Sequence, residues 1–244
     1  MKQITLVTGA GRGIGFAIAE KFARAGHELI LLVQDKNQIN FLKKELGKIS
    51  ESKKIYFHGD LRDIKFLSKL DKKVKKVNNL INNAAQANTD YFTNVSGSQI
   101  NNLIEVNLIA PFKLSQIFAK KMIKNKIKGC IVNITSQLGH MAAYNRSLYC
   151  MTKFGLEGLS KAMAMDLAKY GIRSNTVAPT KTIVNQIERK KTVKRLNIIR
   201  NKIPLKKFST TKQIAEIVYF LTTENSSSIT GTSIVSDGGW TAGK

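Results

Sequence analysis

The chain has 244 residues, and its 40 Lys and Arg against 16 Asp and Glu give a formal net charge of +24 at pH 7. Hydrophobic residues make up 43% and charged residues 23%, which excludes wholesale disorder, collagen-like repeats and coiled coils. The length fits one large α/β domain or two small ones. The charge raises nucleic acid, an anionic membrane or an acidic protein as partners, although net charge bears on association and not on fold. Because 32 of the 40 basic residues are Lys, compositional drift explains the charge at least as well as selection for an anionic ligand.

Short β-branched runs alternate along the chain with longer segments of helical spacing. The expected strands are Ile4–Val7, Glu28–Val33, Lys54–Phe57, Asn79–Ile81, Cys130–Ile134, Ser174–Val177 and Ser233–Val235. The expected helices are Gly15–Ala25, Ile39–Ile49, Ile64–Lys73, Gln99–Lys124, Tyr149–Tyr170 and Lys212–Thr222. This order predicts a single-domain α/β Rossmann fold, in which helices cover both faces of a doubly wound, parallel, seven-stranded sheet.

No linker rich in Pro, Gly or Ser divides the chain, so residues 1–244 are expected to form one domain. Within it, residues 181–207 form a long connection with helical patches in Ile183–Arg200, and we expect a substrate lid there. Cys130 and Cys150 lie in no CxxC or metal-spaced group, so we expect no disulfide and no metal site, and we take Cys150 as core packing. The N-terminus lacks the features of a signal peptide and no stretch is long enough to span a membrane, which predicts a cytoplasmic protein.

A glycine-rich segment follows the first expected strand and opens the first expected helix. Glycines permit a tight turn and a close approach of the backbone to a pyrophosphate, and a helix N-terminus supplies N–H donors. In the context of βαβ units this pattern predicts a nucleotide site. The candidate residues in the loop are Gly9, Gly11, Arg12, Gly13, Ile14 and Gly15.

The TGxxxGxG form of this loop, Thr8 to Gly15, resembles that of the short-chain dehydrogenase/reductase family. The resemblance continues through nearly the whole chain in the family's order, at Asp60-Leu61, Asn82-Asn83-Ala84-Ala85, Asn107, Ser136, Tyr149-x-x-x-Lys153, Pro179-Thr180 and Asp237-Gly238-Gly239. Ala85 and Thr180 stand where the family usually has Gly, and we expect only modest local adjustment because both residues are small.

The resemblance implies an NAD(P)-dependent oxidoreductase and a set of residues for its nucleotide. Asp60 would accept from the adenine amino group with Leu61 beside the ring, while Asn82 and Ala84 would line the nucleotide with backbone groups and Pro179 would also contribute. Asp60 can alternatively be the N-cap of the helix that follows, and the two roles do not exclude each other.

The choice between NADP(H) and NAD(H) is a question of charge at the end of the second strand. NAD-specific relatives place an acidic residue there, whereas this chain has Val33 followed by Gln34, which do not repel a 2′-phosphate. Asp35 keeps NAD(H) possible, while Arg12 with Lys36 could pair with the phosphate. The pattern favours NADP(H).

Reduction of a ketone by hydride needs a hydrogen-bond donor to its oxygen and a proton donor of suitable pKa. Tyr149 can give the proton, and the cation of Lys153, four residues later on the same helix face, is expected to lower the phenol's pKa. Ser136 can hydrogen-bond the substrate oxygen. In the family, an Asn such as Asn107 holds a water of a proton relay, although it can also be a buried structural amide.

Three polar residues lie near Ser136 and the catalytic Tyr149, namely Gln137, His140 and Asn145. They can contact a polar substrate or merely cap the loop. The broad resemblance is to 3-oxoacyl-(acyl-carrier-protein) reductases of fatty acid biosynthesis, with sugar or polyol dehydrogenases as the alternative.

Acyl carrier protein is acidic, so a basic entrance would steer it to the site. The candidate basic residues are Lys126, Lys128, Lys169 and Arg173 near the expected mouth, with Lys181, Arg189, Lys190, Lys191, Lys194 and Arg195 in the lid. Tyr170 counts against this partner, because carrier-protein reductases often have a basic residue at that position.

A nucleic-acid-binding protein on a Rossmann scaffold is a distant alternative. Such a protein should show a basic stripe with stacking aromatic residues, but the basic residues are dispersed and aromatic residues make up only 7% of the chain. We therefore expect neither nucleic acid nor membrane as a partner. The resemblance also implies a homotetramer, associated through Gln99–Lys124, Tyr149–Tyr170 and the C-terminal strand.

Overall fold

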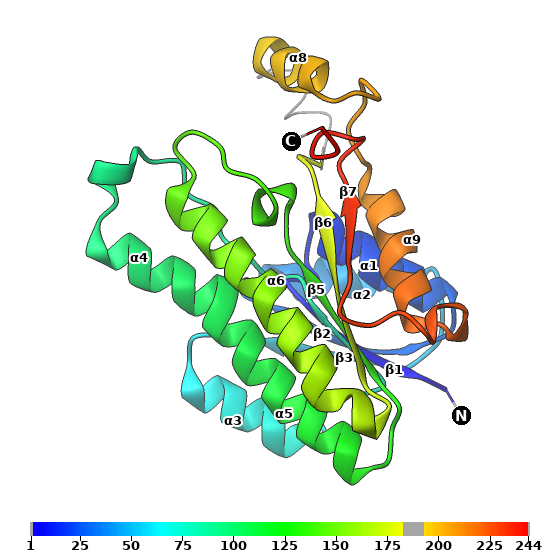
Figure 1. Cartoon of the computed structure of the whole chain (residues 1–244). Coiled ribbons are helices and arrows are strands. Elements are labelled where there is room, and N and C mark those ends of the chain that lie inside the picture. The colour runs from blue at the N-terminus through cyan, green and yellow to red at the C-terminus, as the bar shows by residue number, and fades with distance from the viewer. Residues whose placement is uncertain (1, 183–192, 244) are drawn as a thin grey trace.

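A computed structural model of the chain describes residues 2–182 and 193–243 (Figure 1). Seven parallel strands form one sheet in the order β3-β2-β1-β4-β5-β6-β7, which confirms the predicted doubly wound Rossmann fold. The strands are β1 (Ile4–Thr8), β2 (Glu28–Val33), β3 (Lys54–His58), β4 (Asn79–Asn82), β5 (Cys130–Ile134), β6 (Arg173–Pro179) and β7 (Ser233–Ser236).

Helices cover both faces of this sheet (Figure 1). One face carries α1 (Gly13–Arg24), α2 (Asn37–Gly47) and α9 (Thr211–Thr222), and the other carries α3 (Ile64–Lys73), α4 (Gly97–Ile104), α5 (Ala110–Lys124) and α6 (Ser147–Leu167). A further helix, α8 (Val193–Lys202), lies beyond the carboxyl ends of β6 and β7. No helix within the described ranges has the length and apolarity that crossing a membrane requires.

The core consists of two apolar layers, one on each side of the sheet. Side chains alternate between the two faces along a strand, so neighbours in register share a face. Val7 is in register with Leu31 and with Ile81, and all three belong to the layer under α1 and α9. Leu6 and Leu80, one position earlier on β1 and β4, belong to the layer under α3 and α5.

The helix predicted over Gln99–Lys124 is interrupted. A π-helical turn, η2 (Glu105–Ile109), separates α4 from α5. Pro111 explains part of this interruption, because proline has no N–H to donate to the carbonyl group four residues earlier, which is that of Asn107. The N–H of Ala110 instead bonds to the carbonyl oxygen of Glu105, the spacing of a π-helix.

Candidate active site

A cavity opens at the carboxyl ends of β1, β4, β5 and β6, where the strand order reverses between β1 and β4. Ligands bind at such a reversal in open α/β sheets. Ile198, Ile199 and Lys202 of α8 also line the cavity, so part of the segment 181–207 lies over it.

The glycine loop fits a dinucleotide in its backbone geometry. Gly9 and Gly13 have φ of 63° and 59°, a region in which other residues are strained. A Cβ on Gly15 would lie 2.1 Å from the carbonyl oxygen of Gly9. Arg12, the N-cap residue of α1, makes no capping hydrogen bond with its side chain, so the first turn of α1 can donate its N–H groups to a pyrophosphate.

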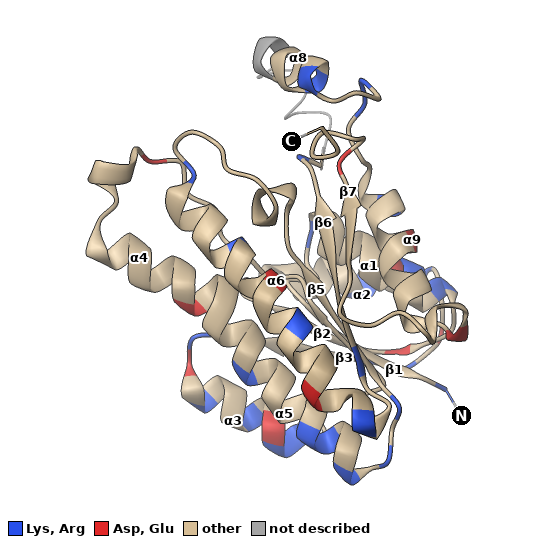
Figure 2. Ribbon diagram, in the orientation of Figure 1, with Lys and Arg blue, Asp and Glu red and all other residues tan. Residues whose placement is uncertain are grey.

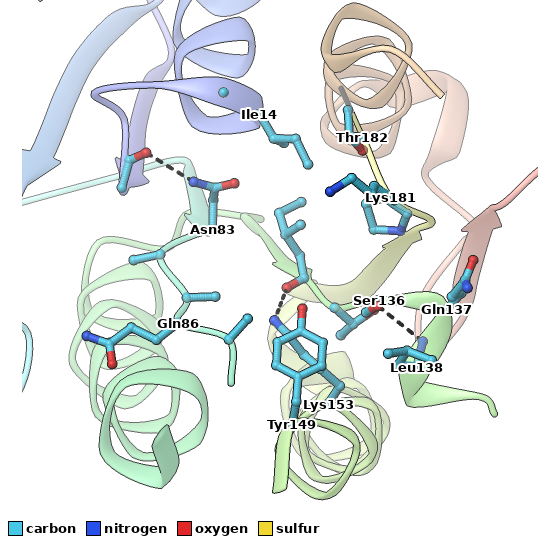
Figure 3. Close-up of a pocket in the computed structure, with 18 of the residues that line it drawn as sticks. Ile14, Asn83, Gln86, Ser136, Gln137, Leu138, Tyr149, Lys153, Lys181 and Thr182 are labelled. Atoms are coloured by element: carbon cyan, nitrogen blue, oxygen red, sulfur yellow. Dashed lines mark hydrogen bonds between the residues drawn. The ribbon is translucent and has the colours of Figure 1, made fainter. Parts of the chain in front are cut away.

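The loop after β4 is locked onto this glycine loop. Thr8 Oγ1 accepts from the backbone N–H groups of Asn83 and Ala84, each at 2.9 Å. Asn83 Nδ2 donates to the carbonyl oxygen of Thr8 at 2.9 Å. It also donates to the carbonyl oxygen of Gly9 at 3.2 Å (Figure 3). The sequence reasoning did not single out Thr8 or Asn83, although both lie within the motifs it used.

Most of the predicted nucleotide-binding residues line the cavity. They are Gly9, Arg12, Gly13, Ile14, Gly15, Gln34, Asp60, Leu61, Ala84 and Pro179. The structure does not bring Gly11 and Asn82 there. Gly11 packs against the side chain of Gln38, which would clash with a Cβ at 2.0 Å, and Asn82 is buried with its Nδ2 bonded to Ser115 and Asn133.

The alternative role of Asp60 as a helix N-cap is wrong. Asp63 caps α3, because its side chain accepts from the N–H of Lys65 at 2.8 Å. Asp60 instead forms a 2.6 Å ion pair with Arg62, whose hydrogen bonds and charge lower the pKa of the Asp60 carboxyl group.

The residues after β2 divide into two groups. Gln34 lines the cavity together with Gln38 and Arg12. Asp35 does not line it, because its carboxylate accepts from the N–H of Asn37 at the start of α2. Lys36, the N-cap residue of α2, does not line it either. Among the described residues that line the cavity near this strand end, the charged group free to meet a 2′-phosphate is therefore a cation, Arg12.

Ser136, Tyr149 and Lys153 lie together in the cavity (Figure 3). Lys153 is 2% exposed; its Nζ donates to the carbonyl oxygen of Ile134 at 2.9 Å and lies 5.6 Å from the centre of the Tyr149 ring. Burial lowers the pKa of Lys153 to about 8, against which the charge of Glu157 acts.

The expectation that Lys153 lowers the pKa of the Tyr149 phenol is wrong for the protein alone. Burial raises this pKa, because a phenolate is poorly solvated there. The interaction with Ser136 and the charge of Arg146 oppose the rise.

Asn107 sits in the π-helical turn and is 1% exposed. Its Oδ1 accepts from the N–H of Gln86 at 2.8 Å, and its Nδ2 donates to the carbonyl oxygen of Gln86 at 2.9 Å and to Thr152 Oγ1 at 3.2 Å. Thr152 in turn donates to the carbonyl oxygen of Tyr149. Asn107 therefore ties the loop after β4 to the helix that carries Tyr149, and its side chain does not line the cavity.

Of the three predicted substrate residues, only Gln137 lines the cavity. Gln137 is 6% exposed, and its Oε1 has no hydrogen-bond partner in the described part of the chain. His140 is turned to Glu157 and Ser233, at 3.1 and 2.9 Å from its Nε2, and Asn145 is exposed in a left-handed turn with φ of 60°. The sequence reasoning missed other lining residues, among them Met141, Ala142, Ala143, Tyr144, Arg146 and Trp240.

The basic residues predicted near the mouth lie at the wrong end of the sheet. Lys126 and Lys128 precede β5, and Lys169 and Arg173 precede or begin β6, so all four lie at the amino ends of these strands. Arg173 donates to the carbonyl oxygens of Ile229 and Leu221 and is not free for a partner. Figure 2 shows Lys and Arg gathered at this end of α3, α5 and α6.

Among the predicted basic residues of the lid, Lys181 is exposed and lines the cavity. Arg189, Lys190 and Lys191 lie outside the described residues, as do the side chains of Lys194 and Arg195.

Comparison with known proteins gives matches along nearly the whole chain. The family model described as enoyl-(acyl carrier protein) reductase matches residues 9–241. The chain is 35% identical to D-erythrulose reductase of Gallus gallus, over 96% of this chain and 94% of that protein. It is 32% identical to L-xylulose reductase of Homo sapiens, over 97% and 96%. It is 31% identical to 3-oxoacyl-(acyl-carrier-protein) reductase FabG of Buchnera aphidicola, over 98% and 97%.

Solved structures are equally similar. A 4-hydroxyisoleucine dehydrogenase complexed with NADH superposes with a TM-score of 0.91 at 31% identity, covering 100% of both chains. A protein of Beutenbergia cavernae described as an NAD(P)-dependent gluconate 5-dehydrogenase, with NADP at low occupancy, superposes with a TM-score of 0.89 at 28% identity, covering 98% of this chain and 97% of that one.

Proposed function

Because the chain belongs to the short-chain dehydrogenase/reductase family, whose members are NAD(P)-dependent oxidoreductases of carbonyl and CH–OH groups, we propose that it interconverts a small keto-sugar and the corresponding polyol. The observation that carries this substrate class is a pair of buried, unpaired polar atoms that belong to two residues lining the cavity. Gln137 Oε1 and Thr180 Oγ1 are buried and have no hydrogen-bond partner among the described residues. A buried polar atom without a partner costs about 1–3 kcal/mol, which a substrate hydroxyl can recover.

The relatives support this substrate class. D-erythrulose reductase and L-xylulose reductase act on small ketoses by their names, and both align with nearly all of this chain. Thr180, which stands where the family usually has Gly, supplies one of the two unpaired atoms.

The nicotinamide, when bound, gives or takes the hydride. Three side chains of this protein supply the rest of the chemistry. Ser136 bonds the substrate oxygen, Tyr149 transfers a proton to or from it, and the buried Lys153 cation stabilises the charge that develops beside the phenol. The loops after β1 and β4 position the dinucleotide through Thr8 and Asn83.

We assign NADP(H) as the favoured dinucleotide, with NAD(H) also possible. Arg12 faces the cavity near Gln34, and Asp35 is engaged at the start of α2. A carboxylate that would repel a 2′-phosphate is thus turned away, while a guanidinium remains for it.

A 3-oxoacyl-(acyl-carrier-protein) reductase is the second candidate. The description of the family model and the Buchnera aphidicola relative favour it. The position of Lys126, Lys128, Lys169 and Arg173 at the amino ends of β5 and β6 counts against carrier-protein docking at the cavity of the same chain.

We also propose a homotetramer in a reducing cytoplasm. Phe112, Met151, Phe154 and Met165 are large, exposed apolar residues of α5 and α6 that association would cover. Cys130 and Cys150 are free thiols. The molar mass in solution, measured by light scattering, tests the assembly.

The substrate class is tested by measuring NADPH-dependent rates with L-xylulose and erythrulose, against a 3-oxoacyl thioester on acyl carrier protein. Tyr149→Phe serves as the inactive blank. We expect the ketoses to have the higher kcat/KM. We expect Gln137→Leu to lower kcat/KM for a ketose by about tenfold, but not for 2,3-butanedione, which has no hydroxyl group.

Asn40→Leu, which replaces an amide by Leu at an exposed position of α2 outside the cavity lining, is the matched control. Preference for the carrier-protein thioester, or equal losses of Gln137→Leu on both small substrates, would overturn the proposal.

A further inference from the structure

The side chain of Glu157 is a carboxylate buried outside the cavity, with no role in the reaction described above. It lies on α6 and is 7% exposed. Thr135 Oγ1 of the segment after β5 lies 2.5 Å from Oε1, and Thr176 Oγ1 of β6 lies 2.6 Å from Oε2. Ser233 Oγ of β7 donates at 3.2 Å, and His140 Nε2 lies at 3.1 Å. One carboxylate therefore binds side chains from the segment after β5, from β6 and β7, and from the loop after Ser136.

Glu157 is linked to two catalytic residues, to Ser136 through the segment before it and to Lys153 along α6. Thr135 immediately precedes Ser136, and Lys153 lies one helical turn before Glu157 on α6. The turn Gln137–Gly139 is seated on α6 at the same place. A Cβ on Gly139 would come within 3.1 Å of the Lys153 carbonyl oxygen and 3.2 Å of Glu157 Cγ. The position of Glu157 is thus fixed relative to both Ser136 and Lys153.

The charges around Glu157 are few. The segment after β5, together with β6 and β7, presents the hydroxyl groups of Thr135, Thr176 and Ser233. The loop presents His140, and α6 presents Lys153, beyond which lies the Tyr149 phenol. The negative charge of Glu157 raises the pKa of Lys153 against the effect of burial.

We propose that Glu157 is a positioning residue for the reaction, which keeps the Lys153 side chain cationic and fixes the turn that carries Ser136, without touching substrate or dinucleotide. The inference rests on the oxidoreductase activity of the family and not on a ketose as substrate. The hydrogen bonds of the Glu157 carboxylate join it to Thr135, His140, Thr176 and Ser233 of the chain itself, so its effect must pass through Lys153 and through the bonded turn.

The pH profile of kcat separates this role from a merely structural one. The substrate is 2,3-butanedione with NADPH, so that the outcome does not depend on the proposed substrate class. If the Lys153 cation is needed, kcat falls at alkaline pH as the lysine loses its proton. We expect Glu157→Gln to move this alkaline limb about one pH unit lower, because the opposing charge is gone. A structural role would lower kcat or stability and leave the limb where it is.

Two control variants separate the charge from the packing and from the histidine. Glu157→Asp keeps the charge, and His140→Gln removes the imidazole, so both are expected to keep the limb of the wild type. Where Glu157→Gln does not fold, Glu157→Met replaces it, because it also removes the negative charge and is expected to move the limb in the same direction. A limb unmoved in the folded variant that lacks the charge, or moved equally in Glu157→Asp, would overturn the proposal.

A second measurement needs no turnover and no dinucleotide. The stability difference between a protein with Lys153 and its Lys153→Met variant is followed against pH, once in the wild type and once in Glu157→Gln. The pH at which this difference begins to change reports the titration of Lys153 in the folded state. We expect it near 8 in the wild type and lower in Glu157→Gln. Identical curves in the two backgrounds would overturn the proposal, even if the protein reduced none of the carbonyl compounds tried.

Discussion

The Nζ atom of Lys153 lies 2.9 Å from the carbonyl oxygen of Ile134, so the ammonium group of α6 is bonded to the last residue of β5, two positions before Ser136. The contact joins the catalytic helix to the strand end that carries the catalytic serine. It also holds a cation that is almost completely buried from solvent, and this burial has a measurable effect on stability.

The stability that Lys153 contributes is expected to rise with pH. The pKa of this lysine is about 8 in the folded chain, against 10.5 for an ordinary lysine. Between these values the unfolded chain binds more protons, so the free energy of unfolding increases with pH, while below pH 8 the cost of burying the cation applies in full. In this pH window, chemical denaturation should show the free energy of unfolding of the wild type rising, relative to that of Lys153→Met, by roughly 1 kcal/mol per pH unit.

Lys161→Met, at an exposed position of the same helix, is the matched control for the removal of a lysine. A difference between wild type and Lys153→Met that stays flat from pH 7 to pH 10 would contradict the prediction.

Gly15→Ala is expected to abolish tight binding of NADPH. Its Cβ would lie 2.1 Å from the carbonyl oxygen of Gly9 and 2.5 Å from Asn83 Nδ2, so the two loops that form the nucleotide site would have to separate. Gly158→Ala on α6 is the control, because a Cβ there meets no atom within 4 Å. It should leave binding unchanged and stabilise the helix by up to about 1 kcal/mol. Fluorescence titration with NADPH compares the affinities of Gly15→Ala and Gly158→Ala. Equal affinities would show that the two loops can move apart around the new Cβ without loss of binding.

Asn107→Ala is expected to weaken NADPH binding and to cost about 1–3 kcal/mol of stability. The side chain bonds both the N–H and the carbonyl group of Gln86, and its loss leaves a polar gap between the loop after β4 and α6. Asn101→Ala, at an exposed position of α4, should change neither quantity. Urea denaturation and NADPH titration of both variants give the comparison. A loss of turnover in Asn107→Ala with stability and affinity intact would point instead to a role in proton transfer alone.

Arg12→Gln is expected to lower the affinity for NADPH by about tenfold and to leave that for NADH unchanged. Arg12 lines the cavity near Gln34, where a guanidinium can bond the 2′-phosphate. Lys36→Gln also removes one positive charge, but from a residue that does not line the cavity. It therefore controls for the change in overall electrostatic potential. Parallel losses for both dinucleotides would assign Arg12 to the pyrophosphate instead.

The sequence predicted the fold well because its signals are local. The seven strands are short β-branched runs, and each begins and ends within two residues of its expected bounds. The π-helical turn was not predicted, because Glu105–Ile109 keeps a helical pattern of apolar residues and the wider spacing depends on Pro111 and on the bonds of Asn107 in the folded chain.

The site was predicted only where a motif fixes the residue. Ser136, Tyr149 and Lys153 meet as expected, because strand end and helix bring them together. His140 and Asn145 were judged by their closeness in sequence to Ser136, but the carboxylate that holds His140 belongs to Glu157, on a helix that begins after this loop. The pKa of Tyr149 could not be predicted either, because it depends on the burial of the phenol.

The π-helical turn makes the length of a helix matter for function. Exposed positions between Gly97 and Lys124 can exchange side chains without moving the backbone, but a one-residue deletion that restored regular α-helix would rotate α5 by about 100° relative to α4. Asn107 would then leave Gln86, and the loop after β4 would lose its tie to the catalytic helix. Along this segment the residue count, and not only the residue identities, is therefore under constraint.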